Sequence, residues 1–142
     1  MLDDCTEARR EIDEANSDAA GHYVDDGEAN ALGLMIANHT DTCPRVRKRV
    51  EGFFHIFMAR GGPTPTEDVI LNVDATGMKA DLLNPAYDPQ VVTDKVAVYA
   101  KIREKRDAGR LNQTQVDTFF GQLRGADTVA KVKQIAAAVA AA

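Results

Sequence analysis

The segment 43–62, CPRVRKRVEGFFHIFMARGG, constrains the fold more than any other part of the chain. Its apolar residues recur at helical spacing, at Val46, Val50, Phe53, Phe54 and Phe57. At about 100° per residue these positions form one apolar arc, which is typical of a helix packed against a core. Pro44 suits the first turn of that helix, and Gly61-Gly62-Pro63 predicts its end.

Other segments also predict helices. Small apolar residues recur every three or four positions over residues 5–20, and an apolar run at 28–38 and a broad valine-rich face at 89–108 extend the pattern. Residues 66–83 fit a helix that begins at Thr66 better than a short strand, since a lone strand would have no partner. The last two helices are expected to follow caps at Asn112 and Asp127. The fold class predicted is all-α.

We expect residues 1–142 to form a single compact domain of about six or seven helices. An acidic N-terminal helical part is expected at 1–42, core helices at 43–108 and a C-terminal helical hairpin at 109–142. Leu34 and Met35 are expected to be buried, because apolar residues surround their helix. The centre of the core is predicted to hold Phe53, Phe54, Phe57, Val92, Tyr99, Ile102, Phe119, Phe120 and Leu123.

The composition is that of a globular domain. The chain has 142 residues, of which 44% are hydrophobic and 27% charged, enough to bury one core. It contains no apolar run near the roughly 18 residues that span a bilayer, and its acidic N-terminus lacks the features of a signal peptide. We therefore expect a cytoplasmic or virion location. The two cysteines, Cys5 and Cys43, are then expected to be free thiols, although a bridge between them is possible.

Charge is unevenly distributed. The net charge is −5, but residues 1–30 carry ten acids against Arg9 and Arg10, whereas 45–60 and 101–110 are basic. Either these segments neutralise one another within the fold, which we favour, or a basic face meets an external polyanion or partner. The candidate contact residues are Arg45, Arg47, Lys48, Arg49, Arg60, Lys101, Arg103, Lys105 and Arg106.

No sequence motif indicates catalysis or a cofactor. There is no phosphate-binding glycine loop and no zinc-protease motif. The acidic stretch before Glu28 fails the calcium-loop pattern, because His22 stands where the loop requires glycine. His39, Asp41 and Cys43 match no common zinc spacing. We therefore expect no metal and no cofactor, and an enzyme built on these three residues and His55 is the weakest of three hypotheses.

The leading hypothesis is a non-enzymatic structural or interaction subunit of a larger protein assembly. Small, acidic, helical chains without motifs are common among bacteriophage virion components such as connector, decoration or ejection proteins. Its partners would be other protein subunits, in a homo- or hetero-oligomer, with no membrane span. The alternative is a nucleic-acid-associated or regulatory protein that uses the basic helix 45–60.

Overall fold

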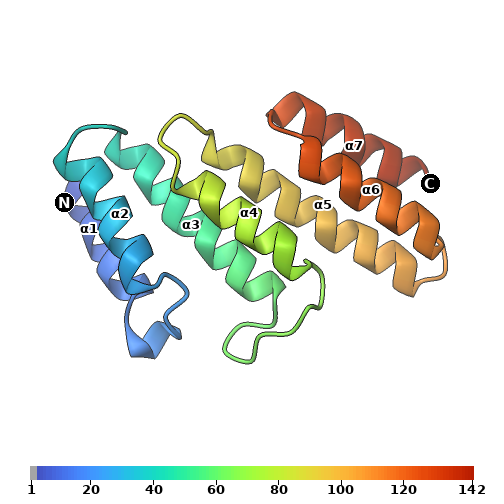
Figure 1. Ribbon diagram of the computed structural model, residues 1–142, viewed down its shortest axis with the longest axis horizontal. Coiled ribbons are helices and arrows are strands. Elements are labelled where there is room, and N and C mark those ends of the chain that lie inside the picture. The colour runs from blue at the N-terminus through green and yellow to red at the C-terminus, as the bar shows by residue number, and fades with distance from the viewer. Residues whose placement is uncertain (1–2) are drawn as a thin grey trace.

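Seven α-helices alternate in direction along the length of the molecule, with the two termini at opposite ends (Figure 1). The computed structural model describes residues 3–142, and those residues contain no strand. The helices are α1 (Asp4–Ala15), α2 (Asp26–Ala37), α3 (Cys43–Ala59), α4 (Asn72–Leu82), α5 (Pro89–Asp107), α6 (Gln113–Gly125) and α7 (Val129–Ala141), with a short 3-10 helix at Asp18–Ala20. The prediction of one all-α domain is confirmed.

The helices form two layers. The most extensive contacts join α1 to α3, α3 to α5 and α5 to α7, so the odd-numbered helices make one layer. Each even-numbered helix packs on two consecutive odd ones: α2 on α1 and α3, α4 on α3 and α5, and α6 on α5 and α7. No comparably extensive contact joins α2 to α4 or α4 to α6 among the described residues. The second layer is therefore open between its helices.

Side-chain caps explain most of the helix starts. Thr42 accepts a hydrogen bond from the Arg45 backbone N–H, and Pro44 lies in the first turn of α3. Asn112 and Gln115 form a capping box at the start of α6, as expected. The last helix is capped by Thr128 and not by Asp127, because Asp127 instead pairs with Lys131 at 2.8 Å.

Two predicted helix boundaries are wrong. The first helix ends at Ala15, and the Asn16 side chain then donates to the Val24 carbonyl at 2.9 Å. The helix expected over 66–83 begins only at Asn72. Asn72 accepts a hydrogen bond from Arg60 and donates one to Glu67, so the segment before α4 is held as a loop. This loop buries Ile70 completely.

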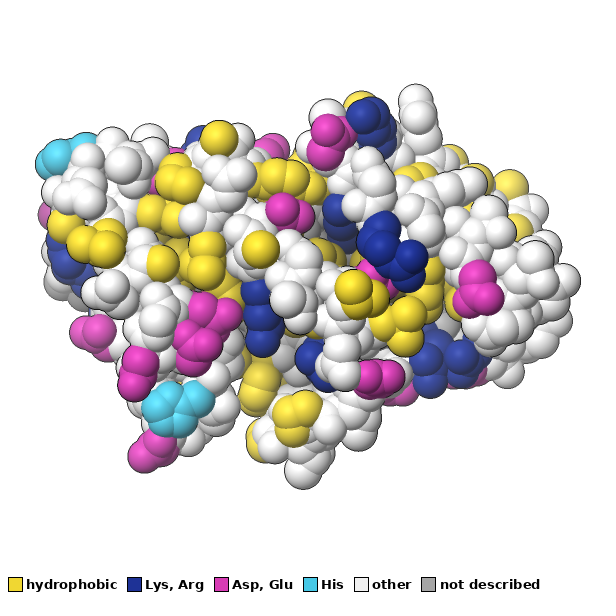
Figure 2. All heavy atoms as spheres, viewed as in Figure 1, with side chains coloured by type: hydrophobic (Ala, Val, Ile, Leu, Met, Phe, Trp, Pro, Cys, Tyr) yellow, Lys and Arg dark blue, Asp and Glu magenta, His cyan; other side chains and the backbone are white. Residues whose placement is uncertain are grey.

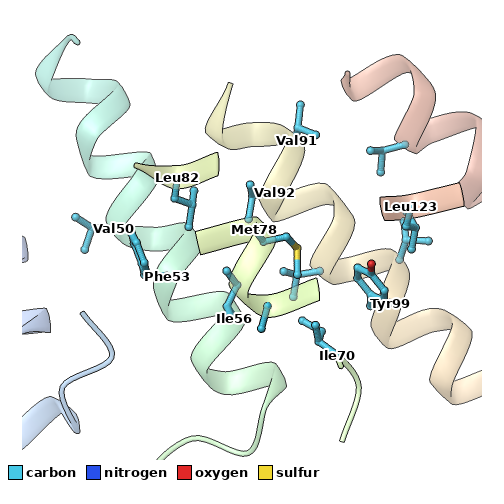
Figure 3. Packing of buried hydrophobic residues seen from close by; sticks show 14 of the residues in the cluster. Val50, Phe53, Ile56, Ile70, Met78, Leu82, Val91, Val92, Tyr99 and Leu123 are labelled. Carbon is cyan, nitrogen blue, oxygen red and sulfur yellow. The ribbon is translucent and has the colours of Figure 1, made fainter. Parts of the chain in front are cut away.

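The core lies between the two layers. Phe53, Tyr99 and Leu123 are almost completely buried, and Figure 3 shows Ile56, Met78 and Val92 filling the space between α3, α4 and α5. Val92, Ile102 and Phe120 are also buried as predicted.

Part of the predicted core is exposed. Phe54 is 41% exposed and Leu34 is 48% exposed, while Phe57 and Phe119 are only half-buried. Phe54 lies about 100° around the helix from Phe53, so it points past the core. It packs edge-to-face on Tyr23, with ring centroids 5.3 Å apart.

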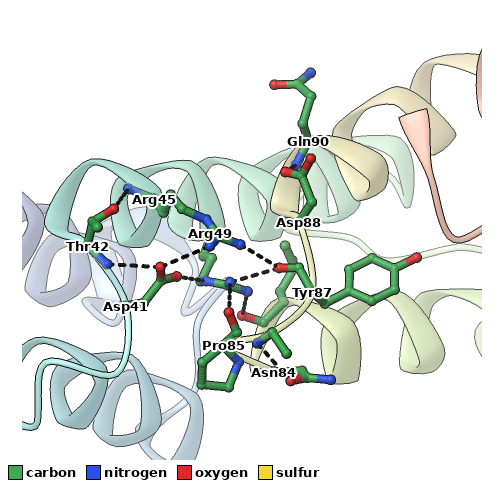
Figure 4. A network of polar contacts seen from close by, with 11 residues as sticks. Asp41, Thr42, Arg45, Arg49, Asn84, Pro85, Tyr87, Asp88 and Gln90 are labelled. Atoms are coloured by element: carbon green, nitrogen blue, oxygen red, sulfur yellow. Dashed lines mark hydrogen bonds and ion pairs between the residues drawn. The ribbon is translucent and has the colours of Figure 1, made fainter. Parts of the chain in front are cut away.

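A buried guanidinium joins three parts of the chain. Arg49 has no exposed surface, and its Nε donates to Asp41 at 2.7 Å. Its Nη1 donates to the Leu82 carbonyl at 3.0 Å, and its Nη2 donates to the carbonyls of Pro85 at 3.2 Å and Tyr87 at 2.8 Å (Figure 4). The loop before α3, α3 itself and the loop after α4 are thereby fixed together.

A disulfide joins Cys5 in the first turn of α1 to Cys43 in the first turn of α3, with Cα atoms 4.9 Å apart. The expectation of two free thiols is therefore wrong. The cause is tertiary: α1 and α3 pack along their lengths, which brings their N-terminal ends together. Cys43 is buried at this contact, whereas Cys5 is exposed.

We predict that Arg49→Met lowers the free energy of unfolding by about 3 kcal/mol, because the buried Asp41 carboxylate loses its nearest cation. The carbonyls of Leu82 and Pro85 also lose their side-chain donor, whereas Arg45 still contacts Asp41. The measurement is urea unfolding followed by circular dichroism at pH 7. Arg47→Met is the matched control: Arg47 also pairs with two acids, but its side chain is 39% exposed, so about 1 kcal/mol or less is expected. If Arg49→Met and Arg47→Met lower the free energy of unfolding equally, the role assigned to Arg49 is wrong.

We predict that Cys5→Ala lowers the free energy of unfolding by about 4 kcal/mol, since the bridge closes a loop with a sequence separation of 38 residues. A dithiol reductant should lower the stability of the wild-type chain to a similar extent and leave Cys5→Ala unchanged. If the reductant leaves the free energy of unfolding of the wild type unchanged, the disulfide does not contribute to stability.

Candidate functional site

The opening between α2 and α4 forms a groove whose floor is α3. Figure 2 shows hydrophobic side chains gathered between α2 and α4 on this face. The lower end of the groove deepens into a cavity of about 280 Å³. The cavity is lined by Gly21, His22, Tyr23, Asp25, Glu28, Ile56, Phe57, Arg60, Gly62, Pro65 and Lys79. We refer to these residues as the α2–α4 groove.

The floor of the groove is aromatic. Tyr23 and Phe57 pack with ring centroids 5.6 Å apart, and Ile56 lies buried beside them. Gly21 permits this arrangement: it has a φ of +78°, and a Cβ there would lie 3.1 Å from Phe57 Cζ. Burial raises the pKa of the Tyr23 hydroxyl, and the carboxylates of Glu14 and Glu11 raise it further. Tyr23 is therefore a neutral, amphipathic surface for an incoming side chain.

The two sides of the groove carry opposite charges. Asp25 and Glu28 lie on the α2 side, and Lys79 and Arg60 lie on the side of α4 and the end of α3. Lys79 has no ion-pair partner among residues 3–142. Burial raises the pKa of the Glu28 carboxyl, while a hydrogen bond from the Asp25 N–H at 2.9 Å and the charge of Lys79 act in the opposite direction.

The groove was not identified from the sequence. The acidic stretch before Glu28 fails the calcium-loop pattern, and in the structure Asp25 and Glu28 form the capping box of α2. That capping pattern fixes Glu28 in the first turn and is a sequence signal that would have placed it. No comparable signal exists for Lys79, whose place opposite Glu28 depends on how α2 and α4 pack on α3.

The candidate basic residues do not form one exposed face. Arg49 and Lys105 are buried and donate to main-chain carbonyls, so neither is available at the surface. Arg47 pairs with Asp4 at 3.0 Å and Glu11 at 2.8 Å, which is the internal neutralisation that we favoured. Five others contact acids or amides within the fold: Arg45–Asp41, Arg60–Asn72, Lys101–Glu104, Arg103–Asp68 and Arg106–Asp107. Lys48 is exposed and has no ion-pair partner in the described part of the chain.

His39, Asp41 and Cys43 do come together, in an open cleft of about 810 Å³ beside the disulfide. The geometry does not provide a nucleophile there, because Cys43 is bonded to Cys5 and Asp41 is held by Arg49. His55 lies three turns further along α3, about 18 Å from Cys43 along the helix axis, and contacts Glu51 at 3.3 Å. The four residues thus do not form one catalytic group.

Within residues 3–142, no group of three or more His, Cys, Asp or Glu side chains is placed to bind a metal ion. None of the helices in the described chain is long and apolar enough to cross a membrane. No protein-family model, curated protein or solved structure shows significant similarity to the chain.

We predict that Glu28→Gln raises stability at pH 7 by a small amount, below about 1 kcal/mol, and flattens its dependence on pH. The raised pKa means that the folded state binds a proton more readily than the unfolded chain. Wild-type stability should therefore fall as pH rises from the ordinary value of 4.5 through the raised pKa, and the glutamine variant should lack this fall. Thermal unfolding between pH 4 and pH 8 measures both effects.

Glu28→Ala is the control for this experiment, because it removes the capping hydrogen bond together with the charge. It should be less stable than Glu28→Gln at every pH, by about 1 kcal/mol. A glutamine variant that keeps the wild-type pH dependence would show that Glu28 does not titrate in a buried setting.

Proposed function

We propose that this chain is a non-enzymatic interaction subunit of a larger protein assembly, and that the α2–α4 groove receives a segment of a partner chain. The observation that carries the proposal is the groove itself, an opening with an aromatic floor between two helices that pack on α3 but not extensively on each other. Partner segments commonly bind in such grooves by inserting apolar anchors.

The cavity suits one apolar anchor. Binding energy at protein interfaces is concentrated in a few side chains that fill well-packed pockets. Tyr23, Ile56 and Phe57 offer such a side chain an apolar and partly aromatic surface within a volume of about 280 Å³. A leucine or an aromatic residue of the partner would cover these groups and remove their remaining exposed surface from water.

The charges beside the cavity define the rest of the partner segment. A basic residue next to the anchor would face Asp25 and Glu28, and an acidic residue on the other side would face Lys79 and Arg60. Opposite charges placed in this way select the orientation of the segment and its partner more than they add affinity. The expected occupant is therefore a segment with a base and an acid on either side of an apolar anchor.

We propose that this assembly is a bacteriophage virion. The chain would then be located in the virion or, before assembly, in the cytoplasm. The support is the small, acidic, all-helical and motif-free character of the chain, together with exposed large hydrophobic side chains such as Met58 and Val73, which are 54% and 64% exposed. We do not favour the nucleic-acid alternative, because most of the basic side chains that it requires already bind acids or carbonyls within the fold.

We predict that a displayed library of random peptides, panned on the purified chain, enriches peptides with an apolar anchor flanked by a base and an acid. Lys79→Glu should weaken the selected peptides about fivefold or more, because their acid then meets a like charge. Lys48→Glu is the matched control, an exposed lysine on the far side of α3, and should leave affinity unchanged. Fluorescence anisotropy of a labelled peptide gives the dissociation constants.

The site of binding is checked by amide chemical shifts, which should change around Tyr23 and Phe57. Two outcomes would overturn the proposal. One is a panning experiment that enriches no peptide above background, and the other is a set of peptides that bind wild type and Lys79→Glu with equal affinity.

A further inference from the structure

A second opening, between α4 and α6, contains a lysine without a partner. It is a pocket of about 60 Å³ whose floor is α5. It is lined by Val73, Asp74, Gly77, Met78, Asp81, Lys95, Tyr99 and Arg124. We refer to these residues as the α4–α6 pocket, which is separate from the α2–α4 groove.

Lys95 is only 4% exposed, yet its Nζ makes no hydrogen bond or ion pair with any residue from 3 to 142. None of the acidic side chains that line the pocket accepts a hydrogen bond from the Lys95 Nζ. Asp74 is bound by the Arg124 guanidinium, and Asp81 makes no ion pair in the described chain. The Lys95 Nζ is not among the fully buried polar atoms that lack a partner, so solvent reaches it through the pocket. Burial of most of the side chain still disfavours its protonated form, because much of the hydration of the charge is lost.

Lys105 provides a comparison within the same helix. It is 6% exposed, nearly the same as Lys95. Its Nζ donates to the carbonyls of Val139 at 2.7 Å, Ala140 at 2.9 Å and Ala142 at 2.9 Å. Three acceptors bind the Lys105 Nζ at the end of α7, whereas Lys95 faces a pocket. Helix α5 thus carries two buried lysines. Lys105 binds the end of α7, whereas Lys95 binds no other residue of the described chain.

We propose that Lys95 is a reactive amine that forms an imine with small aldehydes entering the α4–α6 pocket. The volume limits the ligand to a few heavy atoms. This covalent site is independent of partner binding in the α2–α4 groove.

The charged groups of the pocket support this chemistry. Burial lowers the pKa of the Lys95 ammonium, and the carboxylates of Asp81, Asp127 and Asp74 offset only part of that effect. A larger share of the amine is then neutral and nucleophilic. Burial also raises the pKa of the Asp81 carboxyl, and the charge of Lys95 offsets part of that rise, so the form that donates a proton is favoured most when the Lys95 amine is neutral.

The step balances without an oxidant or reductant. The Lys95 nitrogen lone pair attacks the carbonyl carbon, the C–N bond forms, and a proton moves from nitrogen to oxygen to give a carbinolamine. Asp81 then donates a proton to the hydroxyl, the C–O bond breaks and water leaves. The nitrogen forms the C=N bond and returns its proton to Asp81, so amine and aldehyde yield imine and water.

We predict that acetaldehyde with cyanoborohydride, which fixes an imine as a secondary amine, labels Lys95 of the folded chain about tenfold faster than exposed Lys48 at pH 7. Peptide mass spectrometry follows all seven lysines of the chain at once, and Lys105 should stay unlabelled. Benzaldehyde, which is too large for the pocket, should label Lys48 and not Lys95. Asp81→Asn should slow labelling of Lys95 alone.

Access through the pocket is tested by Gly77→Leu. A Cβ at Gly77 meets nothing within 4 Å, so the leucine fits on α4 and narrows the pocket. The matched control is Gly121→Leu on α6, which is equally open but does not line the pocket. Gly77→Leu should slow labelling of Lys95 about tenfold and Gly121→Leu should not.

Three results would overturn the proposal. They are labelling of Lys95 no faster than that of Lys48, labelling of Lys95 only after unfolding, and labelling that Gly77→Leu leaves unchanged. The first two results would show that Lys95 is not a reactive amine in the folded chain. The third would show that the aldehyde does not reach Lys95 through the α4–α6 pocket.

Discussion

The ion pair between Arg49 and Asp41 is the interaction on which the arrangement of the helices most depends. The guanidinium is fully buried, and it binds the carboxylate before α3 and three carbonyls at and after the end of α4. Those carbonyls have no helical partners of their own, so Arg49 serves as the cap of α4. Lys105 does the same for α7 from α5. Two of the chain's cations thus fix helix ends from within the core.

This use of charge determines what the surface offers to other molecules. Arg47 is occupied by Asp4 and Glu11, and Arg49 and Lys105 are buried, so these three cations are not available to a polyanion. The α2–α4 groove differs from a basic surface, because it is an aromatic cavity with acids on one side and bases on the other. Such a surface suits a protein segment better than a polyanion, because both signs of charge are represented.

Local sequence signals predicted the helices and the cap at Asn112, whereas the caps expected at Thr66 and Asp127 are wrong. Contacts between distant segments decided the rest. Arg49 lies one turn before Phe53 and so belongs to the buried arc, but its charge led to its assignment to the surface. Thr66 and the two acids after it are a good cap signal, yet burial of Ile70 and the contacts of Asn72 keep that segment out of the helix. The disulfide depends on the packing of α1 against α3, which no local pattern specifies.

Helix α4 separates the two openings, so its position shapes both of them. Its last turn is held by Arg49 and its first turn by the ion pair between Asp74 and Arg124. It approaches α3 closely at Gly52, where a Cβ would lie 2.8 Å from Leu82 Cδ2. A Cβ at position 52 would force the Leu82 side chain to shift, so Gly52 allows the last turn of α4 to pack closely on α3. Residues of α4 line both openings: Lys79 lines the α2–α4 groove, and Gly77, Met78 and Asp81 line the α4–α6 pocket.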